Sequence, residues 1–234
     1  MEWDEIQRVL VVFAHPDDAE FGSAGTSAKL AGDGKDVFYA VVTDGSKGSS
    51  DPDMSAEQLI KTRQEEQRNA ATIVGVKEVQ FLGFEDGMLE PTLDVRKALT
   101  ASIRRFKPDV VISPSPERNL SAGVFVQHPD HLATGEAALA AVYPCARDRM
   151  TFPDLLAQGL EPHAVREIWV TGTGDPDYFI DITETIDTKV RALQAHVSQV
   201  GHRDVAEFIS QRSRQLAEAQ GMKYAEGFRR IQIG

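Results

Sequence analysis

The sequence has 234 residues, of which 41% are hydrophobic and 26% are charged, as is usual for globular proteins. Its net charge of −11 argues against nucleic acid and against an anionic membrane surface as partners, because both require clustered positive charge. The longest apolar run, Val9 to Ala14, is far too short to span a membrane, and the acidic N-terminus does not resemble a signal peptide. The single cysteine, Cys145, can form no internal disulfide, so we expect a cytoplasmic protein.

Short apolar runs alternate along the chain with longer amphipathic stretches, which predicts strands alternating with helices. In chain order we expect a strand at 8–14, a helix at 20–31, a strand at 37–43, a helix at 55–74, a strand at 78–82, a helix at 93–106, a strand at 109–113, a helix at 128–145, a strand at 167–172, a short edge strand at 177–181, and helices from about 181 to 199 and from about 203 to 220. The long loop at 114–127 suggests a functional segment.

This alternation with short connections is typical of βαβ units, whose parallel strands and right-handed crossovers place helices on both faces of a sheet. No shift in composition marks a domain boundary. We therefore predict an α/β fold in a single domain over residues 1–234, with a doubly wound, Rossmann-like, mainly parallel sheet and the last two helices packed against it.

A short motif, His-Pro-Asp, occurs at 15–17 and again at 128–130. Each copy opens a predicted helix and continues with another possible metal ligand, Asp18 after the first and His131 after the second. Residues three apart at the start of a helix point the same way, so His15 can converge with Asp18, and His128 with His131. If the first and fourth strands are neighbours, both motifs face one crevice beyond the carboxyl ends of the strands.

Two histidines and one aspartate around a metal ion leave a position open for water, which is the pattern of a catalytic zinc site. Asp17 would then lie beside the metal without binding it, where a free carboxylate can act as a general base. The same ligand types also suit iron(II) or another divalent ion. The plainer alternative is that Asp17 or Asp18 only caps a helix and that the histidines are only hydrogen-bonded.

The first motif resembles the first signature of the LmbE-like (PIG-L) family of zinc-dependent de-N-acetylases, in the stretch Ala14-His15-Pro16-Asp17-Asp18-Ala19-Glu20 followed by Gly22 and Gly25-Thr26. The second motif, with His131, resembles the second signature. Three further stretches resemble family segments in the right order: Arg63 with Glu66, Leu82 to Gly87, and Lys189 to Gln199. The resemblance covers nearly the whole chain and implies one domain of this family.

The resemblance implies a hydrolase that removes the N-acetyl group from a small N-acetylglucosamine-type conjugate and releases acetate and a free amine. It assigns the metal, Zn²⁺ by default, to His15, Asp18 and His131, and it assigns the role of general base to Asp17. It also implies a possible homo-oligomer, trimeric or hexameric.

Within the second signature, the resemblance makes His128 the group that steadies the oxyanion or protonates the departing amine, with Asp130 orienting its ring. A carboxylate beside an imidazole favours the charged ring, so the pKa of His128 is expected to be raised. The resemblance further places three side chains against the substrate: Arg63, Asp86 and His196.

Some relatives carry a Tyr or an Arg just before the second signature, where Val126 and Gln127 stand here, which weakens the case for an acidic aglycone such as malate. Two alternatives stay open. An amidase that cleaves a larger acyl group from an amino-sugar thiol conjugate would use the same site residues. A non-catalytic sugar- or nucleotide-binding module would bind no metal and would not need Asp17, although the first strand–helix turn lacks the G-x-G-x-x-G pattern of dinucleotide sites.

Overall fold

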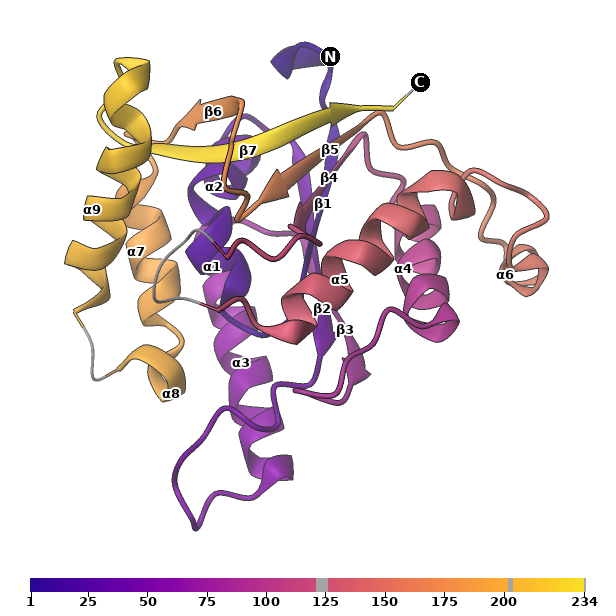
Figure 1. The fold of residues 1–234 in the computed structure, drawn as a ribbon, viewed down its shortest axis with the longest axis horizontal. Coiled ribbons are helices and arrows are strands. Elements are labelled where there is room, and N and C mark those ends of the chain that lie inside the picture. Colours follow the sequence, from indigo (N-terminus) through magenta and orange to yellow (C-terminus); the bar gives the residue numbers. More distant parts are fainter. Residues whose placement is uncertain (121–125, 202–203, 234) are drawn as a thin grey trace.

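β1 (Arg8–Phe13) lies inside the sheet, between β2 and β4, in the computed structural model, which describes residues 1–120, 126–201 and 204–233 (Figure 1). The described strands follow the order β3-β2-β1-β4-β5-β7-β6. The first five run parallel to one another, and β7 is antiparallel to both of its neighbours, β5 and β6. The remaining strands are β2 (Asp36–Thr43), β3 (Glu78–Phe84), β4 (Val110–Pro114), β5 (Glu167–Thr171), β6 (Tyr178–Asp181) and β7 (Ala225–Gln232).

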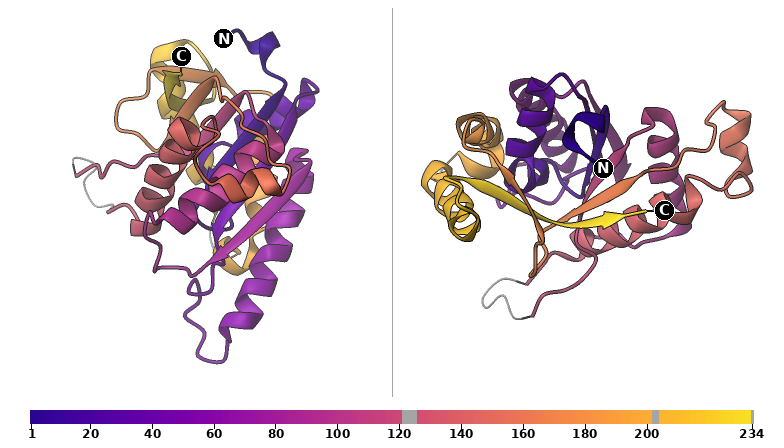
Figure 2. Two further views of the ribbon diagram at one scale, coloured as in Figure 1. Left: turned by 90° about the vertical axis from the view of Figure 1, so that its right-hand side faces the viewer. Right: turned by 90° about the horizontal axis from the view of Figure 1, so that it is seen from above.

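Helices cover both faces of this sheet (Figure 2). On one face lie α2, α3, α7 and α9, and on the other lie α4 and α5. The helix bounds are α1 (Asp18–Gly22), α2 (Ala24–Gly32), α3 (Ala56–Val74), α4 (Leu93–Phe106), α5 (Pro129–Ala140), α6 (Pro153–Ala157), α7 (Ile186–Gln194), α8 (Val197–Val200) and α9 (Val205–Ala217). The expected α/β fold, with a mainly parallel sheet and helices on both faces, is confirmed.

The side chains of β1 show why this strand is central. Val9 and Val11 pack into the core beneath α2 and α7, whereas Leu10 and Val12 pack into the core beneath α4 and α5. Successive side chains of a strand point to opposite faces, so a strand that is covered on both faces is apolar throughout. Each fully buried side chain of this size contributes about 1.5–3 kcal/mol of transfer free energy. Burial therefore fixes the end of β1, and with it the position of His15.

β7 was not expected from the sequence. It pairs antiparallel with β5 and, along its first half, with β6, so the expected short edge strand is held by β7 and not by the parallel strands. Arg229 and Arg230 interrupt the apolar alternation of this strand. Arg230 is accommodated because its guanidinium reaches the buried carboxylate of Glu167, 2.7 Å away. This ion pair thus helps to hold a strand where the hydrophobic pattern is weak.

Three expected helices are interrupted. The helix expected at 20–31 is divided at Ser23 into α1 and α2, and the one expected up to residue 199 is divided at Ala195 and His196 into α7 and α8. The helix expected at 128–145 is α5 followed by a π-turn, Ala141–Cys145. By contrast α3 has its expected ends, because the Ser55 side chain caps its first turn and Gly75 ends it with φ +91°.

Two expectations fall partly outside the described residues: positions 121–125 of the loop at 114–127, and positions 202–203 at the start of the last helix. That helix is described from Val205 as α9 and is followed by a 3₁₀ turn, Glu218–Gln220. The helices in the described part of the chain are too short or too polar to cross a membrane.

Candidate metal centre and active site

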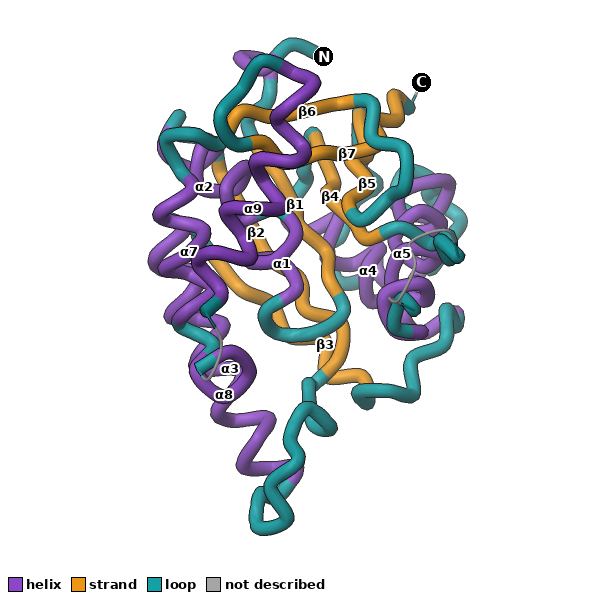
Figure 3. The backbone as a smooth tube through the Cα atoms, turned by 60° about the vertical axis from the view of Figure 1, so that its left-hand side comes forward, coloured by secondary structure: helices purple, strands orange, loops and turns teal. Residues whose placement is uncertain are grey.

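The two His-Pro-Asp motifs meet where the order of the strands reverses. After β1 the chain crosses to β2 on one side, whereas β4 pairs with β1 on the other side, with Val11 opposite Ile112. The chain leaves β1 directly into His15, and α5 begins at His128 after the loop that follows β4. Figure 3 shows β1 and β4 side by side, with α1 and α5 next to them. The expected neighbourhood of the first and fourth strands is therefore confirmed, and a crevice at such a point is a common ligand site.

Three side chains from these motifs converge on one point. The Nδ1 atom of His15 lies 3.2 Å from Nε2 of His131 and 3.3 Å from Oδ2 of Asp18, and Nε2 of His131 lies 3.0 Å from Oδ1 of Asp18. Bonds of about 2.0–2.1 Å to a tetrahedral ion would separate its ligands by about 3.3 Å. The donor set of His15, Asp18 and His131 therefore fits a divalent metal ion.

The electrostatics of these three residues are those of a cation site. Burial alone would lower the pKa of His15, but the carboxylates of Asp130, Asp18 and Asp86 outweigh it and raise that pKa to about 12. The pKa of His131 is also raised, since Asp18 outweighs its burial. Burial alone would raise the pKa of Asp18, yet His131 and His15 hold it well below its usual range. The same carboxylates that favour charged imidazoles would favour a metal cation at this point.

The other nitrogen of His15 is held by two carboxylates. Nε2 lies 3.1 Å from Oδ2 of Asp130 and 3.1 Å from Oδ1 of Asp86. Asp130 is fully buried and also accepts hydrogen bonds from the main-chain N–H groups of Gly87 and Leu89. A carboxylate on the far nitrogen keeps the proton there and leaves Nδ1 unprotonated for a metal.

The contacts of Asp130 differ from those expected from the sequence. Its carboxylate is 3.9 Å from Nδ1 of His128, which instead accepts the main-chain N–H of Asp130 at 3.2 Å as the cap of α5. The pKa of His128 is lowered and not raised as expected: burial and the charge of the neighbouring His15 lower it, and the opposing effect of Asp130 is smaller. The first turn of α5 points the carboxylate of Asp130 towards β1, so Asp130 orients the ring of His15.

Asp17 combines strained backbone with a perturbed carboxyl group. Its φ of 103° and ψ of −26° are uncommon for a residue other than glycine, and such conformations cluster at functional sites. Burial and the negative charge of Asp18 raise the pKa of Asp17 to about 7, against the opposing charge of Arg63. A carboxyl with a pKa near neutrality is suited to both taking and returning a proton.

The three residues expected against the substrate are buried side chains. Arg63 is 4% exposed and donates to the carbonyl oxygens of Gly45 and Pro16. Asp86 is 5% exposed and accepts from the main-chain N–H of Lys47 as well as from His15. His196 has no exposed surface, and its Nε2 lies 3.1 Å from the carboxylate of Glu20. The structure thus places Arg63 and Asp86 beside Asp17 and His15, and places His196 behind Glu20.

Two buried polar residues were missed from the sequence. Glu20 is fully buried in α1, and Gln67 is fully buried in α3, where it lies between Glu20 and the main chain of Asp17. Gln67 lies four residues after Arg63 on one helix, so both are on the same face. This spacing could have indicated from the sequence that Gln67 lies near the site.

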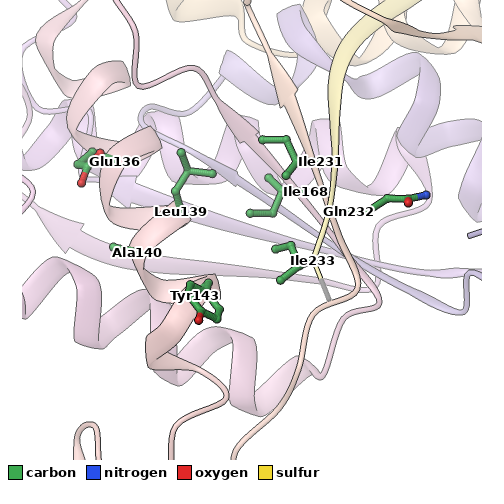
Figure 4. Close-up of a pocket in the computed structure, with 8 residues that line it drawn as sticks. All are labelled: Glu136, Leu139, Ala140, Tyr143, Ile168, Ile231, Gln232 and Ile233. Carbon is green, nitrogen blue, oxygen red and sulfur yellow. The ribbon is translucent and has the colours of Figure 1, made fainter.

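A surface hollow lies elsewhere. It has a volume of about 650 Å³ between the second half of α5 and strands β5 and β7, and Figure 4 shows its apolar side chains facing one another. It is lined by Glu136, Leu139, Ala140, Tyr143, Ile168, Ile231, Gln232 and Ile233. The histidines of the second motif lie towards the other end of α5, so this hollow is separate from the His/Asp group.

Comparison with known proteins agrees with this fold. Residues 10–142 match the PIG-L family, described as GlcNAc-PI de-N-acetylase, and the chain belongs to this family of metal-dependent deacetylases. The chain is 36% identical over 231 residues to diacetylchitobiose deacetylase of Thermococcus kodakarensis, covering 97% of this chain and 84% of that protein.

Two further relatives extend the comparison. The chain is 32% identical over 198 residues to a probable N-acetyl-alpha-D-glucosaminyl L-malate deacetylase 2 of Bacillus cereus, covering 82% of this chain and 84% of that protein. A structure of N,N'-diacetylchitobiose deacetylase from Pyrococcus horikoshii, in complex with its inhibitor MPG, has a TM-score of 0.89 and 31% identity, covering 98% of this chain and 85% of that one. The resemblance inferred from the two signatures is therefore confirmed.

Proposed function

We propose that this protein is a zinc-dependent N-deacetylase that hydrolyses the acetamido group of a small N-acetylglucosamine-type sugar and releases acetate and a free amine. The observation that carries the proposal is the convergence of His15, Asp18 and His131 beside Asp17, whose pKa of about 7 suits a general base. The names of the relatives, which are deacetylases of acetylated amino sugars, support the substrate class.

The metal would be held by His15, Asp18 and His131, and two imidazoles with one carboxylate are ligands that zinc accepts readily. When bound, it supplies a Lewis acid that polarises the amide carbonyl and makes water more acidic. Asp86 and Asp130 hold the imidazole of His15 from its far side, which keeps the ligand ring in place.

Asp17 acts as the general base. It accepts a proton from the attacking water while the water oxygen forms a bond to the acetyl carbon. The same carboxyl group then returns the proton to the sugar nitrogen as the C–N bond breaks, so that acetate and amine leave. Arg63, whose Nη2 is 3.4 Å from Oδ2 of Asp17, fixes the carboxyl group between these two steps.

His128 donates a hydrogen bond to the oxyanion. Its Nδ1 accepts the main-chain N–H of Asp130, so the proton of the neutral ring resides on Nε2. Its side chain is 43% exposed, and within the described residues Nε2 has no hydrogen-bond partner. A neutral N–H donor preset in this way stabilises developing negative charge without having to reorganise.

The proposal is tested by measuring acetate release from N-acetylglucosamine, N,N'-diacetylchitobiose and N-acetylglucosaminyl conjugates, with and without a chelator. We expect release from at least one of these that stops in chelator and returns with zinc. Including longer N-acyl analogues distinguishes an amidase for larger acyl groups. Metal-independent binding of the sugars without hydrolysis would instead identify a binding module.

A further inference from the structure

The peptide group between Pro16 and Asp17 is held at both of its polar ends by one helix, α3. Nη2 of Arg63 donates to the carbonyl oxygen of Pro16 at 2.7 Å. Oε1 of Gln67 accepts the N–H of Asp17 at 3.0 Å. Arg63 and Gln67 are four residues apart and therefore lie on one face of the helix, above one another. The orientation of a single peptide plane is thus set by two side chains from one rigid element.

This orientation forces the backbone of Asp17 into its unusual conformation. Rotation of the 16–17 peptide plane changes ψ of Pro16 and φ of Asp17 together, so a plane held at both ends fixes φ of Asp17 at 103°. A non-glycine residue does not remain in this region unless its surroundings hold it there. Arg63 and Gln67 hold the N-terminal side of Asp17, while its carbonyl oxygen accepts the main-chain N–H groups of Glu20 and Phe21.

The direction of the Gln67 amide is itself determined by Glu20. Nε2 of Gln67 donates to both carboxylate oxygens of Glu20, at 3.1 and 3.2 Å, and Glu20 is fully buried. An ionised carboxylate only accepts hydrogen bonds, so the NH₂ group of Gln67 must face Glu20 and its oxygen must face Asp17. His196 in turn holds Glu20 from the other side at 3.1 Å.

We propose that Gln67 is a positioning residue for the general base: with Glu20 behind it, Gln67 holds the main chain of Asp17 so that the carboxyl group is aimed at the attacking water. This inference rests on the proposed function for its kinetic consequence, but its structural part concerns the Asp17 backbone alone. Gln67 touches neither substrate nor metal in this account, so its loss should lower kcat and leave KM and metal content nearly unchanged.

The test compares Gln67→Met, which keeps the length of the side chain but removes its hydrogen bonds, with Gln64→Met on the same helix as the control. Gln64 accepts only an exposed hydrogen bond from Arg68. We expect kcat of Gln67→Met to fall by about 10- to 100-fold, as small misplacements of catalytic groups do, with KM and bound metal within about twofold. A crystal structure of this variant should show the 16–17 peptide rotated.

If Gln67→Met folds poorly, a double variant that exchanges the amide and the carboxylate between positions 67 and 20 provides a second test. Gln67→Glu alone places two buried carboxylates together and should lose activity and stability. Adding Glu20→Gln restores one carboxylate and one amide, with the carboxylate now accepting the N–H of Asp17, so kcat should recover in the double variant.

The inference is overturned if Gln67→Met keeps both its kcat and the orientation of the 16–17 peptide. It is also overturned if the double variant regains thermal stability but its kcat stays as low as that of Gln67→Glu. If the wild-type protein releases no acetate from any substrate, the proposed function fails, while the crystal structure of Gln67→Met still decides whether Gln67 holds the Asp17 backbone.

Discussion

The Nε2 atom of His15 lies 3.1 Å from Oδ2 of Asp130, on the opposite side of the ring from the Nδ1 atom that faces Asp18 and His131. A carboxylate in this position fixes which nitrogen is free to bind a metal. We therefore expect Asp130→Asn to weaken zinc binding by about 10- to 100-fold. Competition with a fluorescent chelator measures this, with the exposed Asp154→Asn as control. Equal affinities of the two variants would contradict the role given to Asp130.

Zinc binding should release protons. The pKa of His15 is raised to about 12 and that of His131 is raised above its ordinary value, so the metal-free site favours protonated rings. A ligating imidazole is neutral, so we expect release of between one and two protons per ion. Calorimetry in buffers of different ionisation enthalpy measures this number. No net proton release would show that His15 and His131 are not both ligands.

The same shift predicts how pH changes the stability of the metal-free protein. The folded pKa of His15 lies above its ordinary value of 6.5, so the stability it contributes is fully present below pH 6.5 and is lost as pH rises towards 12. Over the same pH range zinc binding stabilises the folded protein more strongly, because fewer protons must leave the ligands. The difference in Tm between zinc-bound and metal-free protein should therefore grow from pH 6 to pH 9. A constant difference would contradict this.

Asp17→Asn tests the general base. The amide has nearly the shape of the carboxyl group but cannot accept the proton, so we expect kcat to fall by about 10²–10⁴-fold with normal zinc content. A bound cation favours the carboxylate, so the acid limb of the wild-type pH profile should lie below the pKa of about 7 that Asp17 has without metal. An active Asp17→Asn variant, or one that has lost its zinc, would refute this assignment.

His128→Ala tests the oxyanion donor. Burial and the charge of His15 lower the pKa of His128, so the ring is neutral at and above pH 7. His128 therefore does not set the alkaline limb of the pH–activity profile. We expect kcat to drop by about 10²–10³-fold at every pH, as for loss of one oxyanion donor, with the alkaline limb unmoved. Disappearance of that limb in the variant would restore the charged-imidazole role that the sequence had suggested.

The parallel half of the fold was predictable because its signals are local. The apolar run of β1 and the capped ends of α3 each depend on residues within one element. β7 was not predictable in this way, because its Arg230 is stabilised by Glu167, which is distant in sequence and becomes a partner only once the sheet has formed. The break at His196 likewise carries no proline or glycine, and the break at Ser23 is marked only by Gly22, the last residue of α1.

The convergence of the two His-Pro-Asp motifs was predictable from spacing and strand order, which place His15 near His131. The partners of Asp130 were not, because sequence adjacency suggested His128, whereas the first turn of α5 aims the carboxylate across to His15. His196 was expected against the substrate but is buried behind Glu20, and its spacing in the sequence could not show this. The role of Gln67 could not be predicted from the sequence either, because it depends on the backbone conformation of Asp17.

The most direct test of the account is a zinc titration of chelator-treated protein, following acetate release from an N-acetylglucosamine substrate. Activity should start near zero, rise in proportion to added zinc and level off at about one ion per chain, and His131→Ala should show little activity at the same zinc concentrations. Full activity of the metal-free protein, or an unchanged titration curve for His131→Ala, would contradict the metal centre on which the proposed function depends.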